Sequence, residues 1–239
     1  TTEDIVKAFQ SFRHDTAPGI SGWTVPLLKI AMRSEPVQNM LTTLVTMLLA
    51  GTAPGRSLLC TSRLIALDKP DGGVRPIAVG ELVYRLCTKA ILRHSFRPDS
   101  LSACQFGVGT RSGVEPLIRA VQRAMDGTIP DESFTHVASL DFRNAFNTLS
   151  RREMADSVKK YAPGLWKVAK WAYNDPSDLV FGGLQDVPEV IPSSQGVRQG
   201  DPLGPLLFSV GIRPMLDQLV TALGHEALVL AYLDDVYIL

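Results

Sequence analysis

Two adjacent aspartates, Asp234 and Asp235, interrupt an otherwise apolar run at residues 227–239. The run is rich in Val, Ile, Leu and Tyr, so it predicts two buried strands joined at the acidic pair. Asp-Asp also suits a plain solvent-facing turn, and taken alone that is the simpler interpretation. However, two carboxylates this close raise each other's pKa unless a cation compensates them, and such hard oxygen ligands suit Mg²⁺. A metal site of this kind requires a third carboxylate from elsewhere in the chain.

The candidate for the third carboxylate is Asp141, which closes the segment 135–141. This segment alternates like a strand, with Val137 as one inward-facing residue. A helix is predicted after it, beginning at Ser150 with Glu153 completing a capping box. An Asp between a strand and a helix occupies a place where sheets expose functional groups, although Asp is also a good helix-start residue.

Composition narrows the class of protein. With 239 residues, 45% of them hydrophobic and 20% charged, the chain can bury one substantial core or two small subdomains. No apolar run reaches the roughly 18 residues of a membrane span and no signal peptide opens the chain, so we expect no membrane partner. The chain begins without Met and stops inside a predicted strand, so we expect a fragment of a longer protein.

Cysteine content and charge say less. Three cysteines without metal-ligand spacing indicate a reducing, intracellular compartment, nucleus or cytoplasm. The net charge of zero does not favour a nucleic-acid partner, but residues 56–97 hold eight Lys or Arg against three acids. This basic block could follow phosphates, and a solvated helix face explains it almost as well.

The remaining pattern alternates helices with two hairpins. A hairpin is predicted at 58–79, with its turn at 70–73, and Pro76 places the second strand at a sheet edge. Lys69 and Arg75 flank that turn, where they either present two cations together or discourage edge aggregation. Helices are predicted at 2–13, 24–33, 36–50, 81–96, 114–126, around Trp166 and Trp171, and at 203–221 with a kink at Pro214, and a second hairpin at 179–192 around Gly182 and Gly183.

A Gly-rich segment, 105–113, precedes the helix predicted at 114–126. A backbone with small side chains can approach phosphates closely, but the segment lacks the spacing of a Walker loop or a dinucleotide fingerprint. A bare loop before a helix is the simpler interpretation.

Several segments together resemble the successive signatures of reverse transcriptases, in the order found in that family. They are Ser-Leu-Asp-Phe-Arg-Asn-Ala-Phe at 139–146, Gln-Gly-Val-Arg-Gln-Gly-Asp-Pro-Leu at 195–203 and Tyr-Leu-Asp-Asp at 232–235, with Arg-Pro-Ile at 75–77, Gln-Phe-Gly at 105–107 and the loop near residue 17 in support. The similarity covers about residues 15–239. The second signature is most like that of eukaryotic non-LTR retrotransposon enzymes, whereas Leu233 stands where many of these have Ala.

The resemblance implies an α+β fold, the fingers and palm of a right-hand polymerase, with an antiparallel palm sheet packed on helices. Residues 1–55 would form a helical N-terminal extension of the fingers, 56–130 the fingers and 131–239 the palm. The resemblance also leads us to expect the thumb after residue 239.

The resemblance also implies a catalytic site. Asp141, Asp234 and Asp235, with the backbone carbonyl of Phe142, would hold two Mg²⁺ ions, which Mn²⁺ could replace. Lys69 and Arg75 would clamp the triphosphate. Other nucleotide contacts would come from Gln195, Gly196 and Phe146, the last excluding a 2′-hydroxyl or simply packing in the core, and template or primer contacts from Gln105, Gly107, Arg111 and Tyr232.

The expected partners are an RNA template, a DNA or RNA primer and dNTPs, and the expected function is RNA-directed DNA polymerisation. Two alternatives stay open. An RNA-dependent RNA polymerase would normally have a polar residue near position 146 and a Gly before its Asp pair, where this chain has Phe146 and Leu233. A domesticated, non-catalytic nucleic-acid-binding relative would have little use for three buried carboxylates, which are costly to keep.

Overall fold

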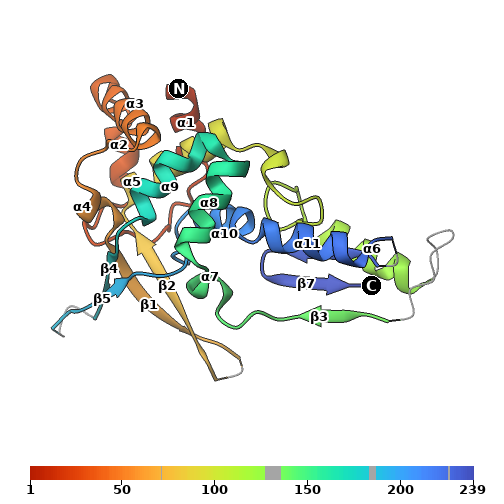
Figure 1. Ribbon diagram of the computed structural model, residues 1–239. Helices are drawn as coiled ribbons and strands as arrows, with labels where there is room; N and C mark the ends of the chain where they lie inside the picture. The colour runs from red at the N-terminus through yellow and green to blue at the C-terminus, as the bar shows by residue number, and fades with distance from the viewer. Residues whose placement is uncertain (71, 127–135, 183–186, 226) are drawn as a thin grey trace.

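The computed structural model shows an α+β chain with two separate sheets (Figure 1), as predicted, and it describes residues 1–70, 72–126, 136–182, 187–225 and 227–239. The helices are α1 (Thr2–Gln10), α2 (Val25–Ala31), α3 (Glu35–Ala50), α4 (Arg56–Cys60), α5 (Leu82–Ser95), α6 (Val114–Met125), α7 (Ala145–Thr148), α8 (Arg151–Tyr161), α9 (Trp166–Tyr173), α10 (Gly204–Gly211) and α11 (Arg213–Leu223). The strands are β1 (Ser62–Asp68), β2 (Val74–Gly80), β3 (Ala138–Leu140), β4 (Ser177–Phe181), β5 (Glu189–Ser193), β6 (Val229–Tyr232) and β7 (Asp235–Ile238).

The larger sheet has the strand order β2-β1-β4-β5 and contains both predicted hairpins. Pro76 lies in the outer strand β2, as predicted, because a residue without an N–H is tolerated at an edge. Strands β1 and β4 pair in parallel, so segments assigned above to the fingers and to the palm share one sheet. The domain boundaries therefore stay predictions. Gly183, placed in the second turn, lies outside the described residues.

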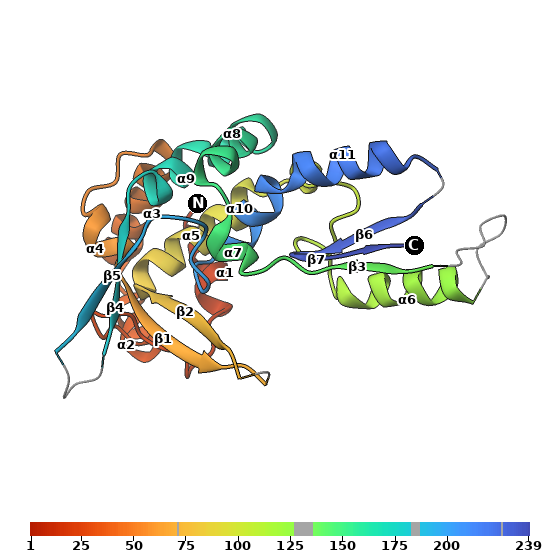
Figure 2. The same ribbon diagram turned by 60° about the horizontal axis from the view of Figure 1, so that its bottom comes forward.

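The smaller sheet has the order β3-β7-β6, is antiparallel throughout, and lies between α11 and α6 (Figure 2). Leu216 of α11 packs with Val236 on one face, and Leu117 of α6 packs with Leu230 on the other. Both helices cover β6 and β7, and the side chains of β3 are exposed. The expectation that Val137 points inward is therefore wrong: its side chain is 45% exposed, because it precedes an uncovered edge strand.

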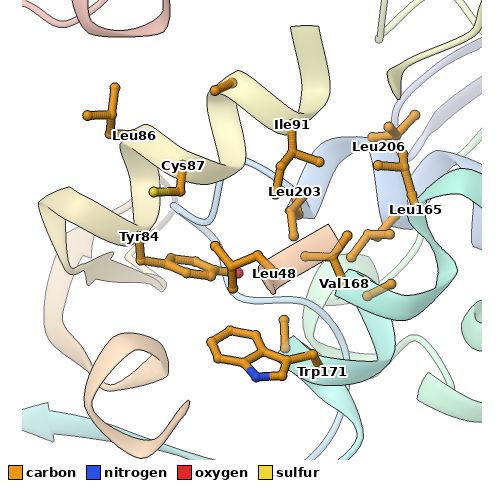
Figure 3. Close-up of a cluster of buried hydrophobic side chains, with 14 of the residues drawn as sticks. Leu48, Tyr84, Leu86, Cys87, Ile91, Leu165, Val168, Trp171, Leu203 and Leu206 are labelled. Carbon is orange, nitrogen blue, oxygen red and sulfur yellow. The ribbon is translucent and has the colours of Figure 1, made fainter. Parts of the chain in front are cut away.

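The main core lies between α3, α5, α9 and α10 (Figure 3). Tyr84 of α5 stacks against Trp171 of α9 with ring centroids 6.2 Å apart. The indole N–H of Trp171 donates to the carbonyl of Ala53 at 2.8 Å, so this large side chain is buried without an unpaired donor. Burial of each large apolar side chain in this core stabilises the fold by about 1.5–3 kcal/mol. The core therefore forms a rigid base beneath the loop that precedes α10.

The helix predicted at 203–221 is broken into α10 and α11, which meet at an angle of 41°. Pro214 lies in the first turn of α11, so the predicted kink is confirmed; proline cannot donate the backbone hydrogen bond that would continue α10. The other predicted helices are also present, with ends that differ by a few residues. In the described ranges no single helix is long and apolar enough to span a membrane, although α10 and α11 together meet that test by length and composition.

Candidate active site

The three candidate carboxylates meet at one end of the smaller sheet. Tyr232 pairs with Asp235, so Leu233 and Asp234 form the two-residue turn between β6 and β7. In the β3–β7 ladder the last pair is Leu140 with Val236, and the next residues along each strand are Asp141 and Asp235. Antiparallel pairing therefore brings Asp141 beside the turn, although it lies 93 positions before Asp234 in the sequence.

These carboxylates line a cavity of about 740 Å³. Its wall is shared by the first hairpin, the segment after β3, the loop before α10 and the β6–β7 turn, so it lies between the two sheets. The predicted site residues on this wall are Lys69, Arg75, Asp141, Phe142, Phe146, Tyr232, Asp234 and Asp235. Segments far apart in the chain thus contribute to a single pocket.

The surroundings of Asp234 raise the pKa of its carboxyl above the ordinary value. Partial burial raises its pKa, and the charges of Asp235 and Asp141 raise it further. A backbone hydrogen bond and the positive charge of Arg75 act in the opposite direction without cancelling the rise. Like charges therefore repel one another in this pocket, and a bound cation would relieve that repulsion.

The donor set fits a hard divalent cation, since every candidate ligand is an oxygen atom. Asp141 and Asp235 are exposed and Asp234 is half-buried, which leaves their oxygens accessible. Within the described part of the chain, however, no three Asp, Glu, His or Cys side chains are grouped as a ready-made ligand set. The structure thus places the carboxylates on one cavity wall without arranging them as a complete cage.

The two hairpin cations lie as expected. Arg75 is in β2 opposite Leu67, and Lys69 is the first residue after β1. The backbone N–H of Lys69 donates to the carbonyl of Gly73 at 2.7 Å, which closes the hairpin end. Both residues line the same cavity as the carboxylates, so positive and negative side chains meet in one pocket.

Phe146 belongs to the short helix α7, which is preceded by the N-cap residue Asn144 in a left-handed conformation with φ 52°. Its ring stacks on Phe208 of α10 with centroids 4.4 Å apart and planes 13° apart. The side chain is half-buried and also reaches the cavity wall. Core packing and a surface offered to a ligand are therefore both present in this one residue.

The loop before α10 departs from expectation. Gln195 and Gly196 are not on the wall of the main cavity, which is instead lined by Gln199 and Gly200. The Gln195 amide donates to the carbonyl of Thr148 at 2.9 Å, and Gly196 fits tightly against the backbone of Phe146. Gly196, with φ 61°, has no room for a Cβ, which would lie 2.3 Å from the Phe146 carbonyl oxygen. Gln195 and Gly196 therefore lie outside the main cavity, and their contact with a nucleotide stays a prediction.

Gln199 and Gly200 run along the outer strand of the larger sheet. The backbone N–H of Ala78 in β2 donates to the Gln199 carbonyl at 2.7 Å. Gly200 has φ 114°, and a Cβ there would lie 2.5 Å from the Ala78 carbonyl oxygen. This close approach fixes the path of the loop and brings Gln199 to the cavity.

The sequence reasoning missed a buried polar network beneath this loop. Tyr84, Tyr173 and Arg198 all donate to the same oxygen, Oδ2, of Asp201, at 3.0, 2.7 and 2.7 Å. The side chains of Arg198 and Asp201 are each 2% exposed. Burial raises the pKa of both tyrosines well above the ordinary value, so the hydroxyls stay protonated donors. Asp201, inside the second signature at 195–203, was the available signal, since a buried Asp needs partners.

Of the residues expected to contact template or primer, some are accessible and others are held against the protein's own backbone. Tyr232 lines the main cavity and a neighbouring one of about 550 Å³ beside α6, and Arg111 is exposed. Gln105 is only 5% exposed, and its amide is bonded to the backbone of Leu233. Gly107 packs directly against the same residue. Burial leaves little of Gln105 available to a nucleic acid.

A polymerase-like right hand with acidic residues between its two sheets is the class of protein that these observations define. Residues 67–239 match the sequence model of the family described as reverse transcriptase (RNA-dependent DNA polymerase). The chain belongs to the reverse transcriptase family, and the predicted resemblance is confirmed.

The curated relatives are proteins of retrotransposable elements. The chain is 30% identical over 245 residues to the retrotransposable element SLACS 132 kDa protein of Trypanosoma brucei gambiense, covering 98% of this chain and 20% of that protein. It is 24% identical over 249 residues to the retrovirus-related Pol polyprotein from type-1 retrotransposable element R2 of Popillia japonica, covering 99% of this chain and 34% of that protein. The chain therefore spans a minor part of each relative.

Among solved structures, the chain is similar to apo telomerase from Candida tropicalis, with a TM-score of 0.54 and 12% identity over 86% of this chain and 43% of that one. A form of that telomerase truncated from its C-terminal domain gives a TM-score of 0.50 at 12% identity, covering 84% of this chain and 48% of that chain. At this identity the likeness concerns the fold, and it agrees with the predicted fingers and palm.

Proposed function

We propose that this chain is the catalytic fingers and palm of an RNA-directed DNA polymerase that extends a DNA or RNA primer on an RNA template with dNTPs. The observation that carries the proposal is the meeting of three carboxylates and two cations on one cavity wall in a chain of this family. The family match separates this function from the RNA-polymerase alternative, and the intact carboxylates favour it over a non-catalytic role.

Asp141, Asp234 and Asp235, with the Phe142 carbonyl, are the residues proposed to hold two Mg²⁺ ions, for which Mn²⁺ could substitute. Divalent cations bound there would lower the pKa of the primer 3′-hydroxyl and stabilise charge on the leaving pyrophosphate. The carboxylates themselves need take no proton. Their repulsion, seen in the raised pKa of Asp234, supports a role as ligands because it disfavours three bare charges in one pocket.

Lys69 and Arg75 are proposed to bind the triphosphate of the incoming nucleotide. Both line the same cavity as the carboxylates, so a nucleotide bound there would have its phosphates within reach of the two cations. Charge-assisted hydrogen bonds to phosphate are strong, and those of Arg can be bidentate. Such contacts carry no information about the base.

The sugar is proposed to rest on Phe146, and Gln199 and Gly200 are its neighbours on the wall of the cavity. Gln195 and Gly196 stay proposed nucleotide contacts. A phenyl ring cannot hydrogen-bond a 2′-hydroxyl, so a ribonucleotide would suffer both a clash and lost solvation. The stacking of Phe146 on Phe208 supports this role because it prevents the ring from retreating. Tyr232 and Arg111 are kept as proposed contacts to template or primer.

An intracellular setting, in the nucleus or cytoplasm, is proposed for this polymerase. It rests on the three cysteines, which are free, buried thiols.

Primer extension on a homopolymer RNA template with Mg²⁺ tests the proposal, using the full-length protein, its Asp234→Asn variant and a matched control, Asp217→Asn, whose exposed carboxylate lies on α11. We expect extension with dNTPs by wild type and control, and a loss of at least about a hundredfold in Asp234→Asn with template binding retained. Wild-type-like extension by Asp234→Asn would overturn the metal assignment. Equal use of dNTPs and NTPs by the wild type would favour the RNA-polymerase alternative. Template binding by the wild type without any primer extension would favour the non-catalytic alternative.

A further inference from the structure

The turn that carries Asp234 is held from outside the sheet by a single buried glutamine. The side-chain carbonyl of Gln105 accepts the backbone N–H of Leu233 at 2.8 Å. Its amide nitrogen donates to the carbonyl of the same residue at 3.2 Å. Gln105 therefore satisfies both backbone groups of the residue that immediately precedes Asp234.

This turn needs external support because of its conformation. Leu233 has φ 56°, in the left-handed region that non-glycine residues rarely adopt, at a cost of roughly 1–2 kcal/mol. A two-residue turn with such a residue persists where the surroundings fix it. In the described structure the Gln105 side chain supplies bonds to both polar groups of the strained residue.

The segment around Gln105 is itself fixed against the sheet. It lies beside β6 in a parallel bridge, with the Phe106 N–H donating to the Ala231 carbonyl and the Ala231 N–H donating to the Cys104 carbonyl, each at 2.7 Å. The N–H of Gly107 donates to the same Gln105 oxygen at 2.9 Å. The glutamine is thus a short, rigid link between a braced segment and the turn.

Gly107 completes the contact by its lack of a side chain. A Cβ at this position would lie 2.5 Å from the Leu233 nitrogen and 2.7 Å from its Cγ. Only glycine allows the segment to approach the turn so closely without displacing it. In the Gln-Phe-Gly sequence, the first and the last residue therefore both contact the turn at Leu233.

We propose that Gln105 is a positioning residue that fixes the Leu233–Asp234 turn, and with it the carboxylates of Asp234 and Asp235, rather than a contact to the template. Its effect on catalysis rests on the proposed polymerase function, whereas its effect on the turn does not. Loss of the amide should let the turn relax, because the hydrogen bonds that offset the left-handed conformation disappear.

Hydrogen exchange in the metal-free protein tests the positioning directly, read at single amides. Gln105→Met keeps the length of the side chain and removes its polar groups. We expect exchange at Leu233 and Gly107 to speed by at least about tenfold, with no change at Ala78, whose N–H is bonded to Gln199 in the other sheet. The matched control is Gln38→Met, which removes a glutamine bonded to the Met32 carbonyl far from the site.

If Gln105→Met does not fold, Gln105→Asn keeps an amide that is one methylene too short to reach both groups of Leu233, and the same two amides are read. Unchanged exchange at Leu233 and Gly107, or equal acceleration at Ala78, would overturn the proposal.

Kinetics in the full-length protein give the second readout. For Gln105→Met we expect kcat to fall by at least about tenfold and the half-saturating Mg²⁺ concentration to rise. The KM for dNTPs and the affinity for the template should stay within about twofold of the wild-type values. Weakened template binding with a normal kcat would assign Gln105 to template contact instead. A wild-type protein without extension would refute the polymerase proposal alone, since the exchange experiment does not depend on activity.

Discussion

Replacing Asp201 with Asn should destabilise the fold more than any exposed acidic substitution, because one oxygen of Asp201 accepts hydrogen bonds from three buried side chains, Tyr84, Tyr173 and Arg198. Its other oxygen accepts the backbone N–H of Leu203 at 3.0 Å. An asparagine has one oxygen and one NH₂ group, so it must abandon either Leu203 or the cluster of Arg198 and the two tyrosines. In either orientation, an NH₂ group faces a donor.

The size of the effect follows from the burial of the pair. Removing one partner of a buried ion pair leaves an uncompensated charge and typically costs about 3–5 kcal/mol. With both side chains 2% exposed, water cannot replace the lost carboxylate beside Arg198. Since whole domains are stable by only about 5–15 kcal/mol, a large share of the stability should be lost.

Urea unfolding followed by tryptophan fluorescence and far-UV circular dichroism measures this difference. The matched control is Asp217→Asn, which breaks a partly exposed pair with Arg213 within one helix and should cost at most about 1 kcal/mol. Tyr84→Phe removes the hydrogen bond from the Tyr84 hydroxyl to Asp201 and should cost about 1.5–3 kcal/mol, which keeps the test available if Asp201→Asn does not fold. A loss below about 1 kcal/mol for Asp201→Asn at an unchanged urea dependence would refute the reasoning.

Three further predictions concern the cavity. Phe146→Val should narrow the preference for dGTP over GTP by about 10- to 100-fold in kcat/KM on one RNA template, equivalent to about 1.4–2.8 kcal/mol; an unmoved ratio would leave Phe146 only its packing on Phe208. Arg75→Ala should raise KM for all four dNTPs by a similar factor, since a triphosphate contact carries no base information, and a base-selective effect in steady-state kinetics would contradict the clamp. Asp234→Asn should stabilise the metal-free protein at neutral pH by less than about 1 kcal/mol, because burial and then Asp235 and Asp141 raise the folded-state pKa and the ionised form is the disfavoured one. That advantage should vanish as the pH falls below about 3.9, where the unfolded carboxyl is also protonated; melting curves in a chelator at several pH values would expose an opposite trend.

Local chemistry accounts for what the sequence could predict of the fold. Pro76 restricts its strand to an edge and Pro214 interrupts a helix, each through a missing N–H that acts wherever the residue lies. The hairpin with Lys69 and Arg75 at its end follows from alternation and turn residues. These features depend on neighbours in the chain, so they are readable without knowledge of the tertiary structure.

The acidic residues of the site could also be predicted. Asp234 and Asp235 are conspicuous because charge is costly inside an apolar run, and Asp141 because it ends a strand. The structure brings them together on the wall of one cavity, as the resemblance to the family implied. The choice between exposed and buried residues at β3 could not be predicted, since alternation does not reveal that helices cover only the neighbouring strands, and Val137 was misplaced for this reason.

The sequence by itself thus determined the family, the carboxylates and the cationic hairpin, and only the tertiary structure decided which glutamine serves which purpose. Gln195 and Gln199 lie four positions apart in one loop, and contacts of Gly196 and Gly200 with distant backbone turn the second toward the cavity. Gln105 bonds to Leu233 across 128 positions of chain, a partnership that no local pattern encodes. The physical reason is that a side-chain amide both donates and accepts, so its role is set by whichever backbone the fold brings within hydrogen-bonding distance.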